Sequence, residues 1–191
     1  MTKTSSFLLA GGAALFFGIG SALVAVIGET ALSLINVPAL FKNLLQPSAI
    51  GFTTLVFIVI IEECSSFFFS RSFFSATRRW SAPLFLGLGF TLVEVSLAHL
   101  GQTLSSSILT QHFLPLLLLH TATFSLFVSH QKIAVLSLLA GILFHTTYNA
   151  LAFVLAPWFV LLGLSCILLF ISFSVFLARL ASWEYTEIEV N

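Results

Sequence analysis

The sequence predicts an all-α protein: a polytopic bundle of about six transmembrane helices with both termini in the cytoplasm. Of its 191 residues, 59% are hydrophobic and 7% are charged, whereas about a quarter of the residues of a soluble domain are charged. Apolar runs of about 20 residues, long enough to cross the ~30 Å hydrocarbon core as helices, recur along the chain. The formal net charge is zero, so the composition does not indicate a nucleic-acid partner.

The expected spans are residues 6–28, 48–69, 82–100, 107–129, 132–153 and 157–177. We interpret the first as retained in the protein, because its apolar core exceeds the roughly 7–15 residues of a signal peptide. Pro47 and Pro83 mark the beginnings of the second and third spans, and Pro115 predicts a kink in the fourth. The segment Glu29–Gln46 is shorter and of mixed polarity, with Pro38 inside it, and we expect it to be interfacial or re-entrant.

The basic residues support this number of spans. With the N-terminus in the cytoplasm, six of the seven Lys and Arg residues fall on the cytoplasmic side and only Lys42 falls outside, as the positive-inside rule predicts. Residues 1–182 then form one transmembrane domain, and residues 183–191 form a short polar cytoplasmic tail. Short loops and the absence of a transit peptide favour a prokaryotic inner membrane.

Five ionisable side chains lie inside the apolar stretches: Glu62, Glu63, Glu94, His120 and His145. A charged side chain at the centre of a bilayer costs roughly 2.5–3.5 kcal/mol on insertion scales. Counting along the helices at about 1.5 Å per residue places all five within a band about 8 Å wide near the midplane. Because such residues usually mark function, we expect them to face one shared polar site.

Helical spacing refines this expectation. Asn149 follows His145 by four residues, so the two share a helix face. Glu62 and Glu63 are adjacent and point about 100° apart, so we expect one to face the site and the other to face a partner helix. Taken alone, His120 is equally well interpreted as an interhelical hydrogen-bonding residue.

Glutamate and histidine in a pocket of low dielectric suit general acid–base catalysis, in which a glutamate takes a proton from water. Histidine or asparagine can then stabilise a developing oxyanion. The candidates Glu94, His120 and His145 could instead hold Zn²⁺ with a bound water, and the sequence leaves both routes open. The chain contains no HExxH motif, no aspartate and no GxSG element, which argues against zincin, paired-aspartate and rhomboid-like proteases.

Four short motifs follow one another between about Ile58 and Phe153. They are Glu62-Glu63, Gly87-Leu-Gly-Phe-x-x-x-Glu94, His120-x-x-x-Phe124 and His145-x-x-Tyr148-Asn149. The series resembles the PrsW-type branch of the glutamic intramembrane protease superfamily, which also holds the CAAX-processing and bacteriocin-processing (CPBP) proteins and the YhfC-like membrane peptidases. The resemblance implies a multi-spanning endopeptidase whose paired glutamates activate water. It also implies that the remaining glutamate, the two histidines and the final asparagine support the site.

Three positions depart from this pattern. PrsW-type proteins tend to have a lysine where this chain has Ser66, and CPBP members tend to have an arginine where it has Phe67. Val95 stands where an asparagine often follows the second-motif glutamate, and Arg71 lies two turns beyond the glutamate pair. A basic partner is thus missing at its usual place, which bears on the charge state of the glutamates.

From these residues we expect an intramembrane endopeptidase that cleaves a membrane protein or peptide, with Glu62 as the base and Glu63 as its supporting acid. One alternative is a non-enzymatic transporter or proton relay, because proton pathways also place Glu and His in membranes. Another is a catalytically degenerate scaffold that binds substrates without cutting them, as Ser66 and Phe67 suggest. The expected partners are the substrate and the lipid bilayer, and zinc is the one cofactor left open.

Overall fold

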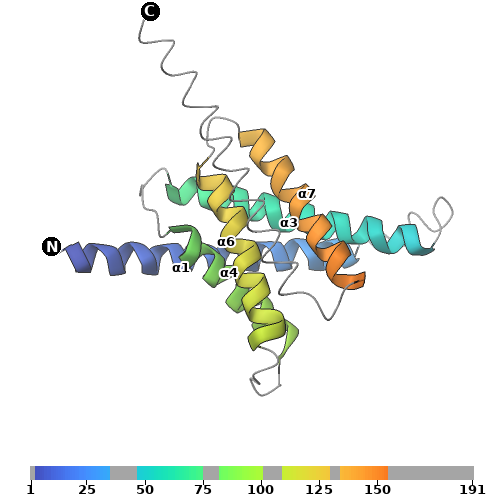
Figure 1. The fold of residues 1–191 in the computed structure, drawn as a ribbon, viewed down its shortest axis with the longest axis horizontal. Helices are drawn as coiled ribbons and strands as arrows, with labels where there is room; N and C mark the ends of the chain where they lie inside the picture. Colours follow the sequence, from blue (N-terminus) through green and yellow to red (C-terminus); the bar gives the residue numbers. More distant parts are fainter. Residues whose placement is uncertain (1–2, 35–46, 75–81, 101–108, 130–133, 155–191) are drawn as a thin grey trace, which may run out of the picture.

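The computed structural model describes residues 3–34, 47–74, 82–100, 109–129 and 134–154 (Figure 1). Every element in these ranges is helical, as the sequence predicts: α1 (Lys3–Leu34), α3 (Pro47–Phe74), α4 (Ala82–Ala98), the short π-helix η1 (Leu109–Phe113), α6 (Leu114–Ser129) and α7 (Ala134–Val154). The expected sixth span, residues 157–177, and the tail at 183–191 lie outside the described residues.

Four helical segments in the described ranges are long and apolar enough to cross a membrane: Leu9–Leu32, Phe52–Ser72, Gln111–Val128 and Ala134–Leu151. Helix α4 is also apolar but has only 17 residues. At about 1.5 Å per residue it is roughly 25 Å long. The length and composition of these helices make the chain an integral membrane protein.

The helices form two crossing groups (Figure 1). α1 and α3 run antiparallel to each other, and α4, α6 and α7 cross them steeply. α3 packs against α1, α6 and α7, while α4 packs between α1 and α6. The helix that carries the glutamate pair is therefore bordered by three of the other helices.

Glycines bring α4 close to both of its neighbours. A Cβ atom added at Gly89 would collide with the backbone carbonyl oxygen of Leu15 on α1, and one added at Gly87 would lie 2.7 Å from the backbone nitrogen of Thr121 on α6. Gly18 of α1 lies in the same contact with α4. Small residues permit such close packing of membrane helices. These close contacts fix the position of Glu94, which lies further along α4.

The first helix is longer than its predicted span. The sequence ended that span at residue 28 and treated Glu29–Gln46 as interfacial or re-entrant, but residues 29–34 continue α1. The Thr30 hydroxyl donates a 2.7 Å hydrogen bond to the Val26 carbonyl, one turn earlier in the helix. The predicted end of the span at residue 28 was wrong because one glutamate was taken as that end, although no proline stands before Pro38. Residues 35–46 of the segment lie outside the described residues.

The fourth span begins with a π-helical turn. η1 ends at Phe113 and α6 begins at Leu114, so Pro115 lies in the first turn of α6. Because η1 runs directly into α6, Pro115 lies inside a continuous helical run, where it has no N–H to donate to an earlier carbonyl. The irregularity expected at Pro115 thus takes the form of a change of helix type just before it.

Substitution of Gly89 by alanine tests the α1–α4 contact. The new methyl group would meet the Leu15 carbonyl, so we expect the protein to lose about 1–3 kcal/mol of unfolding free energy. Gly12→Ala is the matched control, since nothing lies within 4 Å of a Cβ added there. Denaturation of the purified protein in mixed lipid–detergent micelles measures both variants. Equal stability of the two would contradict the close contact.

Candidate functional site

A deeply buried contact between a carboxyl group and an imidazole joins α3 to α7. Glu63 Oε1 lies 2.6 Å from His145 Nδ1, and the two side chains are 1% and 2% exposed. A buried ionisable group is costly unless it is paired and hydrogen-bonded. Each of these side chains therefore needs the other, and together they fix the position of α7 against α3.

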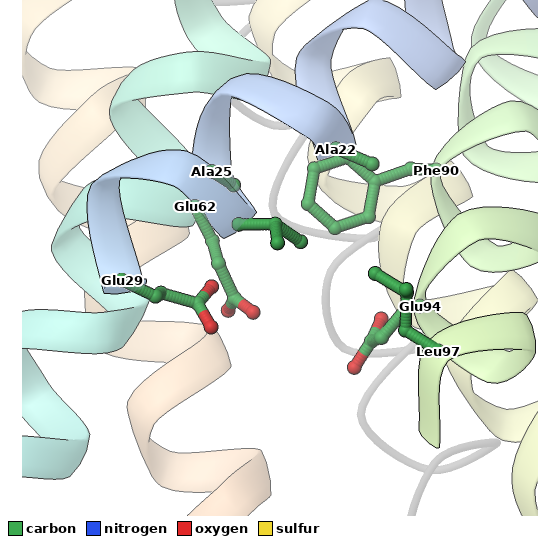
Figure 2. A pocket seen from close by; sticks show the side chains of 8 residues that line it. Ala22, Ala25, Glu29, Glu62, Phe90, Glu94 and Leu97 are labelled. Carbon is green, nitrogen blue, oxygen red and sulfur yellow. The ribbon is translucent and has the colours of Figure 1, made fainter. Parts of the chain in front are cut away.

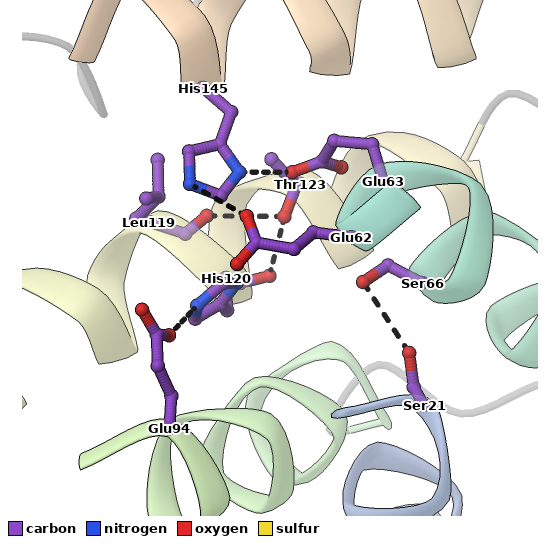
Figure 3. A network of polar contacts seen from close by, with 9 residues as sticks. All are labelled: Ser21, Glu62, Glu63, Ser66, Glu94, Leu119, His120, Thr123 and His145. Carbon is purple, nitrogen blue, oxygen red and sulfur yellow. Dashed lines mark hydrogen bonds and ion pairs between the residues drawn. The ribbon is translucent and has the colours of Figure 1, made fainter. Parts of the chain in front are cut away.

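Glu62 approaches the opposite edge of the same imidazole ring (Figure 3). Its Oε2 atom lies 3.5 Å from His145 Nε2 and has no hydrogen-bond partner among the described residues. Glu62 also lines a cavity, whereas Glu63 pairs with a side chain of the partner helix α7, which agrees with the expectation that one glutamate faces the site and the other a partner helix. Both side chains are long enough to converge on one ring, although their backbone positions are about 100° apart.

A second pair joins α4 to α6. Glu94 Oε2 lies 2.7 Å from His120 Nε2, and Glu94 is 33% exposed whereas His120 is 1% exposed. The His120 ring stacks on Phe90, with 4.2 Å between ring centroids, and it meets the His145 ring edge-on at 5.6 Å. The structure thus brings all five predicted ionisable side chains into one cluster, supplied by four helices.

Asn149 lies one turn beyond His145 on α7 and is half-buried. The contacts described above between the glutamates and histidines do not involve it. Its role at the site therefore stays a prediction based on its spacing from His145.

A cavity of about 270 Å³ opens beside the cluster, between α1, α3 and α4. Three carboxyl groups line it, from Glu29, Glu62 and Glu94. Figure 2 shows the Glu29 and Glu62 carboxyl groups next to each other, with Glu94 across the cavity. The rest of the lining is small or apolar: Ala22, Ala25, Val26, Phe90 and Leu97.

Sequence reasoning missed Glu29, which it had assigned to the interfacial segment. A signal was present, because Ala22, Ala25 and Val26 precede it by seven, four and three residues. Residues at these spacings share one face of a helix. Continuing the first span through Leu34 would have placed Glu29 on the same face as these small residues.

Two of the three positions that depart from the resembled families, Ser66 and Phe67, contact neighbouring helices. Ser66 is 1% exposed, and the Ser21 hydroxyl of α1 donates a 3.5 Å hydrogen bond to it. Phe67 packs edge-on against Phe127 of α6, and the Arg71 guanidinium carbon lies 5.3 Å from the Phe67 ring centroid. Ser66 and Phe67 therefore connect α3 to its neighbours.

The predicted zinc ligands do not converge on one point. No three His, Cys or Glu side chains in the described ranges form a group that could hold a metal ion. Glu94 and His120 face each other, and His145 lies between the two adjacent glutamates. This arrangement does not fit a zinc site, so zinc takes no part in the mechanism derived below.

The fold and the site define a helical membrane protein with a buried glutamate–histidine cluster beside a cavity. No protein-family model, curated protein or solved structure matches the chain. The resemblance to the PrsW-type, CPBP and YhfC-like proteins therefore stays a prediction that depends on the four sequence motifs.

Substitution of Glu63 by alanine tests the α3–α7 contact. The change leaves His145 Nδ1 without its partner, so we expect a loss of about 1–3 kcal/mol of unfolding free energy. Cys64→Ala is the matched control, since Cys64 is the next residue of α3 and its side chain is exposed. Denaturant titration in lipid–detergent micelles measures both. A loss no larger than that of the control would show that this hydrogen bond does not stabilise the fold.

Proposed function

We propose that this protein is an intramembrane endopeptidase that hydrolyses a peptide bond of a membrane-embedded or juxtamembrane substrate. The observation that carries the proposal is the position of Glu62. Its carboxyl group lines a cavity, and one of its oxygens lies 3.5 Å from an imidazole that is itself held by Glu63. A carboxylate at a cavity with a supporting imidazole is an arrangement suited to general base catalysis.

In the proposed reaction, Glu62 takes a proton from water as the water oxygen attacks the substrate carbonyl carbon. The resulting tetrahedral intermediate collapses when the C–N bond breaks, and the proton held by Glu62 passes to the departing amine nitrogen. His145 holds the Glu62 carboxyl group in place through Nε2, while its Nδ1 atom pairs with Glu63. Glu63 is the supporting acid that fixes the orientation of the ring.

The second pair supports the same centre. His120 is fixed by Glu94 and by stacking on Phe90, and in the proposal it orients the attacking water. Asn149, on the same face of α7 as His145, donates a hydrogen bond to the oxyanion. Glu94 is one-third exposed and borders the cavity, which has room for several water molecules.

The proposal includes the wider setting predicted from the sequence. It places the protein in a prokaryotic inner membrane, with six spans and both termini in the cytoplasm. The distribution of basic residues supports this orientation. The four candidate spans in the described ranges are compatible with it.

Glutamine at Glu62 tests the base directly. The purified variant should insert and fold, because glutamine keeps the size of the side chain. It should cleave a labelled transmembrane peptide at least about 100-fold more slowly, since general base catalysis contributes roughly 10²–10⁴ in rate. Cys64→Ala should keep wild-type activity. Cleavage by Glu62→Gln and Glu63→Gln at the wild-type rate would contradict the assignment.

Treatment with a zinc chelator tests the metal-free mechanism. Because the described histidines and glutamates do not converge as ligands, we expect the rate of peptide cleavage to stay unchanged after incubation with 1,10-phenanthroline and after dialysis. Loss of cleavage that added Zn²⁺ restores would contradict metal-free activation of water.

One observation favours a proton relay as the second candidate. The carboxyl and imidazole groups form a continuous series. The centroids of the two histidine rings lie 5.6 Å apart, and each histidine pairs with a glutamate. Proton pathways through membranes use such series. Proton flux in liposomes without any peptide cleavage would favour this function over the peptidase.

A further inference from the structure

The cavity beside the cluster carries an excess of acidic groups. Glu29, Glu62 and Glu94 line it, and its lining includes no lysine or arginine. Glu63 lies directly behind it, bonded to His145. Even if both histidines of the cluster were protonated, two of these four carboxyl groups would have no positive counterpart among the residues of the site.

Buried negative charge must be balanced by bound protons or by a cation, because an isolated charge in apolar surroundings is costly. Glu62 gives the second observation that points to a ligand. The residue is 8% exposed, lines the cavity and has an oxygen that accepts no hydrogen bond from any described residue. The nearest imidazole nitrogen, His145 Nε2, lies 3.5 Å from this oxygen, so a donor inside the cavity could still form a hydrogen bond to it.

The remainder of the lining limits what can enter. It consists of small and apolar side chains from the second halves of α1 and α4. The volume, about 270 Å³, lies just below the range of roughly 300–1,000 Å³ that is common for small-molecule pockets. A cavity of this size has room for one long side chain with an apolar stem and a positive tip.

We propose that this cavity binds a basic side chain of the substrate and that Glu29 is the residue that adds this specificity. A lysine or arginine would lay its methylene groups along Ala22 and Ala25. Its charged end would reach the carboxyl group of Glu29, which leaves Glu62 free to act on water. The assignment to a peptide rests on the proposed function, whereas the recognition of a cation rests on the carboxyl groups themselves.

The test measures peptide binding by the whole protein in nanodiscs of phosphatidylcholine. The probes are fluorescent Leu–Ala membrane peptides that carry one lysine at successive positions near one end, each paired with the same peptide acetylated at that lysine. Acetylation removes the charge and keeps the stem. We expect the best lysine peptide to bind about tenfold more tightly than its acetylated partner, as a charged hydrogen bond would supply.

Glu29→Gln is the decisive variant, because it keeps the shape of the side chain and removes its charge. The ratio of the two affinities should fall severalfold in this variant and stay unchanged in Thr30→Val, which alters the adjacent exposed position. Equal binding of lysine and acetyl-lysine peptides by the wild type at every position would overturn the proposal. An unchanged ratio in Glu29→Gln would overturn it as well.

Two further measurements distinguish this proposal from binding of a lipid headgroup and from the proposed peptidase activity. The ammonium group of a lipid could compete for the same carboxyl groups, so loss of the lysine preference when phosphatidylethanolamine is added would assign the cavity to a lipid and overturn the peptide assignment. Mass spectrometry of the same samples reports cleavage. Cleavage without a lysine preference overturns this inference alone, whereas a preference without cleavage sustains the cation site and counts against the peptidase.

Discussion

The hydrogen bond between Glu63 and His145 is the interaction on which the rest of the site depends. Both groups are nearly inaccessible, so neither can be solvated by water if the other moves away. The contact therefore holds α7 against α3 and turns one edge of the imidazole toward Glu62. A buried pair of this kind is costly to form, and its position beside a cavity is more easily explained by chemistry than by stability.

Contacts with neighbouring side chains also position His120 and Glu94, the second pair of the cluster. His120 is held from three sides, by Glu94, by the Phe90 ring and by the His145 ring. Phe90 and Glu94 both belong to α4, which approaches α1 and α6 closely because of its glycines. The tight helix contacts and the polar cluster are therefore parts of one arrangement, in which small residues set the spacing that the longer side chains bridge.

Much of this arrangement could be predicted from the sequence. Apolar length predicted the described helices, and counting residues from the ends of the spans placed Glu62, Glu94 and His145 at similar depths. Two features could not be read in this way. The end of α1 was misplaced because a glutamate in an apolar helix resembles a boundary, and Glu29 was lost with it. The convergence of two adjacent glutamates depends on side-chain reach, which helical periodicity does not describe.

The shortness of α4 has a consequence for the lipid around it. A hydrophobic helix of 17 residues is shorter than the hydrocarbon thickness it would have to match, and a bilayer accommodates such a mismatch by thinning locally. Near the end of α4, where Leu97 borders the cavity, such thinning would bring the headgroup layer closer to the cavity. The path of water from the membrane surface to the carboxyl groups would be shorter there by the same amount.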